Sequence, residues 1–195
     1  MSALSTLRSL LPWSRPRLRV TSVTRRPARL DLVLVPRTVA TATLAHLHAS
    51  GRHECEEFVF WSGHVLNDGR ALVSRALLPR TTREHGHVAV TDDDQLLALT
   101  DLVHEHGETV LCQGHTHPED AFHSLLDDRG AFADEVGFLS LVLPRFGIGG
   151  LETAEVFRRS GAGWDHLGRV GSGSFLLVFD DVLSYEGGGW RGVRD

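Results

Sequence analysis

The sequence lacks lysine: its 195 residues include 20 basic ones, and every one of them is arginine. This absence excludes a phosphate-binding loop of the usual kind, in which a glycine-rich turn is followed by Lys and then by Ser or Thr. The glycine-rich segment at 147–150 is therefore expected to form an ordinary turn. A compositional bias toward arginine is the simplest explanation for the missing lysine.

Long apolar runs are missing as well. No stretch of about 18 apolar residues exists, which excludes a transmembrane helix of ordinary length. Near the N-terminus Leu10 and Leu11 are followed by Pro12, so the continuous apolar segment of a secretory signal is absent. We expect a cytoplasmic protein with no membrane partner.

Cysteine is scarce, since only Cys55 and Cys112 occur. Each lies beside an apolar segment with a strand-like pattern, which favours buried free thiols in a reducing compartment over a disulfide. A chain of this length buries enough apolar surface to fold without disulfide bonds.

Acidic residues are missing from one end of the chain. Residues 1–29 contain seven arginines and no acidic residue, whereas the remainder carries 13 arginines against 25 acidic residues. Such a basic arm could contact nucleic acid, anionic lipid or an acidic partner, and its composition also resembles an organelle transit peptide. We favour a flexible, solvated arm and expect no nucleic-acid partner.

Helical and strand-like patterns alternate along the rest of the chain. Pro36 and Gly51 bracket one apolar helical stripe, and Asp92–Asp94 provide acidic residues for the first turn of another helix. Helices are expected at 36–50 and 92–106, and strands at 30–35, 56–62, 71–78, 87–90, 108–114, 137–143, 153–157, 163–167 and 174–179. The prediction is an α/β (α+β) domain over 30–182, a curved mixed sheet flanked by helices, followed by a flexible glycine-rich tail at 183–195.

A cluster of polar side chains follows one of the predicted strands. Side chains alternate across a strand, so His115 and His117 point to one face and can chelate one metal ion. Ser124 is a good helix N-cap, which places Asp127 in the first helical turn, where its carboxylate can be a third ligand. Two histidines and a carboxylate leave the fourth tetrahedral position open, as in catalytic zinc sites. His123 could approach the metal or a substrate, but a solvent-facing position in the loop is expected.

A zinc site of this kind needs a carboxylate to take a proton from water. Glu54, Glu56 and Glu57 stand at the start of an aromatic strand and are the candidates. Alternation places Glu56 and Glu57 on opposite faces of that strand. The sequence alone leaves open which face points to the metal.

Together these residues resemble the JAB/JAMM (MPN-domain) metalloproteases, and in particular their stand-alone prokaryotic members. The family pattern is a glutamate on an early strand, then H-[ST]-H-P, a spacer, and S-x-x-D. In the family the glutamate lies seven residues before a glycine, as Glu56 does before Gly63. The spacer here is six residues instead of the usual seven. Keeping the serine frame selects Asp127, whereas Asp128 would restore the distance from the second histidine.

The resemblance implies a single MPN/JAB1-like (cytidine-deaminase-like) domain. It implies that His115, His117 and Asp127 bind Zn²⁺, that Glu56 is the acid/base, and that Ser124 helps to hold the oxyanion. The implied reaction is hydrolysis of isopeptide or peptide bonds after the C-terminal tail of ubiquitin or a ubiquitin-like protein.

The resemblance also implies partners and alternatives. The partners would be a ubiquitin-like protein or its conjugate, and E1-like and E2-like enzymes of the same pathway. Alternatives are a peptidase that processes a sulfur-carrier protein and a non-catalytic MPN scaffold. Beside machinery that attaches modifiers to lysine amines, a chain without lysine would offer only its N-terminal amine to that machinery.

Overall fold

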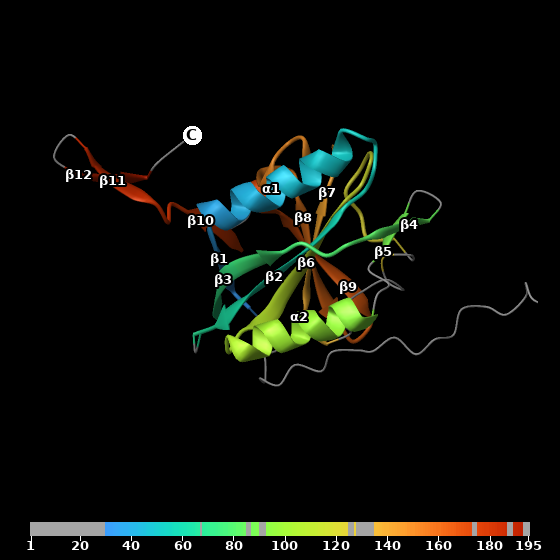
Figure 1. Ribbon diagram of the computed structural model, residues 1–195, viewed down its shortest axis with the longest axis horizontal. Coiled ribbons are helices and arrows are strands. Elements are labelled where there is room, and N and C mark those ends of the chain that lie inside the picture. Colours follow the sequence, from blue (N-terminus) through green and yellow to red (C-terminus); the bar gives the residue numbers. More distant parts are fainter. Residues whose placement is uncertain are drawn as a thin grey trace, which may run out of the picture.

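The protein is an α+β structure built on one mixed, curved sheet (Figure 1). The computed structural model describes residues 30–66, 68–84, 87–89, 93–124, 127, 135–172, 175–186 and 189–192. The basic arm predicted at 1–29 lies outside these residues. No helix in the described part of the chain is long and apolar enough to cross a membrane.

Eight strands make up the sheet. In spatial order they are β10 (Leu176–Phe179), β1 (Leu32–Pro36), β3 (Arg70–Leu77), β2 (Phe58–Val65), β6 (Thr109–Thr116), β7 (Leu139–Leu143), β8 (Glu155–Ser160) and β9 (Gly163–Arg169). β1 is parallel to both of its neighbours, β6 is parallel to β7, and the other pairs are antiparallel. The predicted curved mixed sheet with flanking helices is therefore confirmed.

The two helices cover opposite faces of the sheet (Figure 1). α1 (Arg37–Gly51) packs its buried residues, such as Leu47, into a core with Val59 and Trp61 of β2. α2 (Asp93–Glu105) buries Leu96, Leu99 and Val103 in a second core on the other face, with Phe58, Phe60, Val110 and Phe138. Successive side chains of a strand point to opposite faces, so β2 contributes Val59 and Trp61 to one core and Phe58 and Phe60 to the other.

The chain just after β10 holds the start of α1. The carboxylate of Asp181 accepts hydrogen bonds from the backbone N–H of Thr38, at 3.0 Å, and from the Thr38 hydroxyl, and Arg37 pairs with Asp180. Carboxylates at a helix N-terminus satisfy free N–H groups and complement the helix dipole. These contacts attach the N-terminus of α1 to the residues that follow the edge strand β10.

The end of the chain differs from its prediction as a flexible tail at 183–195. β11 (Leu183–Glu186) and β12 (Gly189–Gly192) form an antiparallel hairpin that lies beyond β10 (Figure 1). Tyr185 stands opposite Trp190 in the register of this pairing. The high glycine content of the segment obscured its two short strands. The predicted strand at 87–90 is β5 (His87–Ala89), which pairs with β4 (Thr82–Glu84).

Both cysteines are free thiols, as predicted, with Cys112 buried and Cys55 half-buried. Cys112 lies in β6, where it adds to the core under α1.

A buried hydrogen bond between α1 and β2 provides a test of this packing. The Trp61 indole N–H donates to the Thr43 hydroxyl at 2.9 Å, and both residues are buried. Thr43→Val keeps the shape but leaves the indole N–H unpaired, so we expect it to lower the free energy of unfolding by about 1–3 kcal/mol. Urea denaturation measures the loss.

Thr100→Val is the matched control for this prediction. Thr100 lies in α2, is half-buried, and donates its hydroxyl to its own helix at Leu96. We expect its replacement to change stability by about 0.5 kcal/mol or less. Equal losses for the two variants would contradict the importance of the Trp61–Thr43 bond.

Candidate metal centre

Strand β6 places two histidines at the centre of the sheet. It is buried along its whole length, paired with β2 on one side and β7 on the other. His115 is 2% exposed and His117, just after the strand, is 6% exposed. Phe58 stands opposite His115, so the imidazoles lie on the face of the sheet that α2 covers. The two side chains face the same way because they are two residues apart in extended chain.

The S-x-x-D segment brings a carboxylate back to these histidines. The backbone N–H of Ser124 donates to Asp127 Oδ2 at 2.6 Å, and the N–H of Asp127 donates to Ser124 Oγ at 3.1 Å. This is the reciprocal bonding of a helix capping box, with Asp in the position that Glu usually takes. It fixes the direction of the Asp127 carboxylate. Asp128, the alternative ligand, lies outside the described residues.

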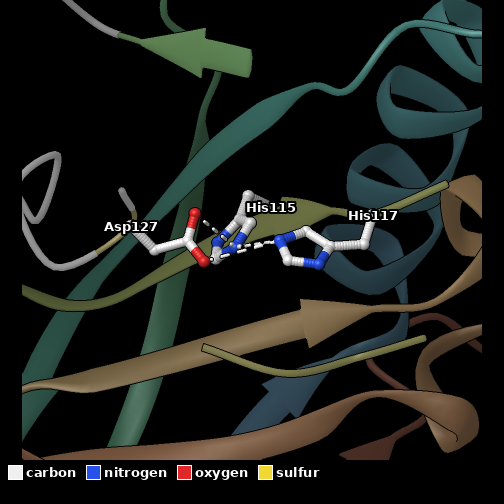
Figure 2. A group of neighbouring side chains, drawn as sticks. All are labelled: His115, His117 and Asp127. Atoms are coloured by element: carbon white, nitrogen blue, oxygen red, sulfur yellow. Dashed lines mark hydrogen bonds and ion pairs between the residues drawn. The ribbon is translucent and has the colours of Figure 1, made fainter. Parts of the chain in front are cut away.

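The three side chains converge on one point (Figure 2). His115 Nε2 lies 3.2 Å from His117 Nε2 and 3.5 Å from Asp127 Oδ1, and His117 Nε2 lies 3.5 Å from Asp127 Oδ2. Ligand atoms about 2.1 Å from a tetrahedral zinc ion are themselves about 3.4 Å apart. The spacing of these donors therefore fits a zinc ion between them.

The electrostatics of the site favour a cation. Burial raises the pKa of Asp127, but hydrogen bonds from His115, His117 and the Ser124 N–H outweigh it and hold that pKa well below the usual range. Burial lowers the pKa of His117, but the Asp127 hydrogen bond and the charges of Asp127 and Glu56 outweigh it, so the net pKa is raised. The carboxylates of Asp127 and Glu56 thus provide negative charge near the two ring nitrogens.

The structure separates the three candidate glutamates. Glu54 is exposed, in a turn with a positive φ of 54°. Glu57 is buried against α1, and its carboxylate accepts hydrogen bonds from the Ser50 and Thr81 hydroxyls at 2.7 and 2.9 Å. Glu56 is half-buried, and its charge acts on His117. Alternation along the strand places Glu56 on the histidine face and Glu57 on the opposite face.

A tight turn after β7 supports the backbone of His117. The N–H of His117 donates to Leu143 O at 2.9 Å, and the N–H of Phe146 donates to His117 O at 2.8 Å. Arg145 and Phe146 both have positive φ, at 49° and 54°. Such strained conformations persist only where neighbouring structure enforces them. Sequence patterns gave no sign of this support, because neither strained residue is glycine.

The prediction that His123 faces solvent is wrong. Its ring is half-buried and stacks on Trp164, with ring centroids 4.2 Å apart and planes at 22°. His123 and Trp164 are far apart in the sequence, so no local pattern indicated this contact.

An open cavity of about 720 Å³ begins at Pro118, the residue after His117. Its lining is mixed in charge and includes Glu119, Arg145, Glu155 and Arg169. None of the three candidate ligands lines it.

We predict that the chain binds one zinc ion through these three side chains. Loss of a residue that hydrogen-bonds to a metal ligand typically weakens metal binding about 10–100-fold. Removing a ligand itself should weaken zinc binding by more than this in each of His115→Ala, His117→Ala and Asp127→Ala. Competition with a chromogenic chelator measures the affinity. His64→Ala removes an exposed histidine of β2 and is the control. Ligand variants that bind zinc as tightly as the His64 variant would contradict the site.

The raised pKa of His117 predicts how the metal-free protein responds to pH. An unfolded histidine titrates near its reference value of 6.5, whereas the folded chain holds the proton to a higher pH. The stabilisation is therefore complete below that reference value and is lost as the pH rises through the folded pKa. With a chelator present, urea denaturation should give lower stability at alkaline than at slightly acidic pH.

Asp127→Asn provides the comparison, because it removes the charge that holds the proton on His117. Its stability should fall less than that of the wild type over the same rise in pH. Parallel pH profiles for the two proteins would contradict the assigned coupling. Asp127 itself titrates far below this window and does not contribute to the difference.

Comparison with known proteins places the chain in a family. No protein-family model matches the sequence. The probable metalloprotease y4jG of Sinorhizobium fredii (strain NBRC 101917 / NGR234) is 34% identical over 117 residues, which are 58% of this chain and 72% of that protein. The solution structure of protein DSY2949 from Desulfitobacterium hafniense has a TM-score of 0.57 at 18% identity, covers 77% of this chain and 95% of its own, and is similar in fold alone. The chain belongs to the family of the probable metalloprotease y4jG.

Proposed function

We propose that the chain is a zinc-dependent peptidase of the JAB/JAMM (MPN) type. One observation carries the proposal: two histidine nitrogens lie 3.2 Å apart, each lies 3.5 Å from an oxygen of the same carboxylate, and Glu56 is on the same face of the sheet. The relative's name, a probable metalloprotease, supports peptidase activity in general.

His115, His117 and Asp127 would hold the metal. When bound by two nitrogens and one oxygen, a zinc ion keeps a free position, lowers the pKa of a coordinated water to about 7 and polarises a carbonyl. The donors are oriented by the protein itself, because the pairing of β6 positions the histidines and the hydrogen bonds to Ser124 position the carboxylate.

Glu56 would move the proton. Its half-buried carboxylate can accept the proton of the attacking water and return it to the leaving amine. Glu57 cannot serve in this way, because its carboxylate is engaged by the hydroxyls of Ser50 and Thr81 on the other face.

Ser124 would assist at the substrate oxygen. Its Oγ accepts the N–H of Asp127, which leaves the hydroxyl hydrogen able to donate to the developing oxyanion. The same residue thus orients a ligand and stabilises the charge that forms in the reaction.

The substrate we propose is a bond that follows the C-terminal tail of a ubiquitin-like protein, free or conjugated. The motif pattern supports it: Glu56, His115-Thr116-His117-Pro118 and Ser124 to Asp127 stand in the family's order. E1-like and E2-like enzymes in the cytoplasm would be the partners. A sulfur-carrier protein is the second candidate substrate, because the chain lacks the long insertions that polyubiquitin-binding members carry.

Glu56→Gln tests the mechanism. With a ubiquitin-like protein or a sulfur carrier fused to a C-terminal reporter, the variant should lose about 10²–10⁴-fold in kcat. Its zinc affinity should fall far less than that of the ligand variants, because Glu56 acts on the site through its charge and is not a ligand. Glu54→Gln, at the exposed neighbouring position, should keep full activity.

Two results would contradict the proposal. One is full activity in the Glu56→Gln variant, and the other is no cleavage of any such fusion by the zinc-loaded wild type. A scaffold without catalysis would give the second result.

A further inference from the structure

The ring of His115 lacks the support that metal-binding histidines usually have. Such histidines commonly donate their second ring N–H to a carboxylate or carbonyl, which fixes the ring. His115 Nδ1 is buried, and it has no hydrogen-bond partner among the residues that the structure describes. The orientation of this ring therefore depends on the side chains packed against it.

Aromatic rings occupy two sides of His115. Phe58 of β2 stacks parallel to it, with centroids 5.8 Å apart and planes at 9°. His123 meets it edge-on, with centroids 5.9 Å apart and planes at 86°. Stacked and edge-to-face arrangements at these distances are the favoured aromatic geometries.

His123 is itself held by three strands toward the β9 edge of the sheet, namely β7, β8 and β9. Its Nε2 lies 3.2 Å from the hydroxyl of Ser140 in β7, which is fully buried. Its ring stacks on Trp164 of β9 and meets Phe157 of β8 edge-on at 5.5 Å. These contacts hold the His123 ring against the sheet, although the residue itself lies in a loop.

The place of His123 in the chain gives it a second effect. It immediately precedes Ser124, whose N–H and hydroxyl orient the Asp127 carboxylate. One side chain thus touches the ring of one candidate ligand and anchors the segment that carries another.

We propose that His123 is a positioning residue for the zinc site. It holds the ring of His115 and the Ser124–Asp127 segment at the separation that the ion requires. His123 is not offered as a further ligand, because the converging donor atoms in the described part of the chain belong to His115, His117 and Asp127 alone. The inference rests on the proposed zinc site and extends it to residues of β7, β8 and β9.

Zinc affinity of the full chain tests this inference without any substrate. His123→Leu removes the ring and the hydrogen bond at similar volume, and we expect it to weaken zinc binding about 10–100-fold. His123→Phe restores the aromatic contacts, so its affinity should lie between those of His123→Leu and the wild type. His166→Leu is the control, because His166 also packs on Phe157, at 5.0 Å, but touches no candidate ligand.

A role in positioning differs from a role in stability alone. Visible spectra of the cobalt-substituted proteins should change for His123→Leu and not for His166→Leu, because they report ligand geometry. Should His123→Leu fail to fold, Ser140→Ala keeps the His123 ring and removes the Ser140 hydroxyl, which bonds to His123 at 3.2 Å and accepts a longer bond from Gln113 at 3.4 Å. This variant should still weaken zinc binding.

The inference is overturned if His123→Leu, or Ser140→Ala in its place, binds zinc within about twofold of the wild type. If the metal-free variant loses stability in urea denaturation but keeps its zinc affinity, His123 contributes to the core and not to the site, and the inference is likewise overturned. A wild-type chain that binds no zinc overturns the zinc site itself. A chain that binds zinc but cleaves nothing contradicts the proposed function alone.

Discussion

The pairing of β6 between β2 and β7 is the constraint on which the site depends. A strand bonded on both edges cannot slip by one residue without turning every side chain to the opposite face. That pairing fixes His115 and His117 on the face that α2 covers, and it fixes Phe58 opposite His115. The opposite face of the same strands carries the larger core under α1. The candidate metal centre and the core thus both depend on one register.

Polar groups accumulate where the sheet would otherwise be apolar. His115, His117, Ser140 and Gln113 are all buried on or beside β6 and β7. Such groups are costly unless they bond to one another or to a ligand. The Asp127 carboxylate meets both histidines, and Ser140 meets His123. A cation between the ring nitrogens would complete the bonding of the first group, which explains why the protein tolerates two buried imidazoles 3.2 Å apart.

Much of this organisation was predictable from the sequence. Period-two and helical patterns located α1, α2 and most strands, because local hydrophobic periodicity dictates them. Alternation placed His115 and His117 together, and the Ser124 cap predicted the place of Asp127. The alternation of side chains placed Glu56 and Glu57 on opposite faces of the strand but could not tell which face carries the histidines. The packing of α2 on the sheet, seen only in the folded structure, identifies that face.

Other features had no local signal. The contacts of His123 with Ser140 and Trp164 join a loop to two strands, β7 and β9, that are distant from it in sequence. The strained turn at Arg145 and Phe146 depends on hydrogen bonds to the histidine segment and not on its own residue types. Each of these rests on long-range contacts that a linear pattern does not contain.

X-ray absorption spectroscopy of the zinc-loaded chain tests the central claim most directly, because it reports the atoms bound to the metal. The account predicts nitrogen and oxygen neighbours at about 2.0–2.2 Å, with the scattering pattern of two imidazoles and no sulfur. A sulfur neighbour at about 2.3 Å would place zinc at a cysteine instead, and would contradict a centre built from His115, His117 and Asp127.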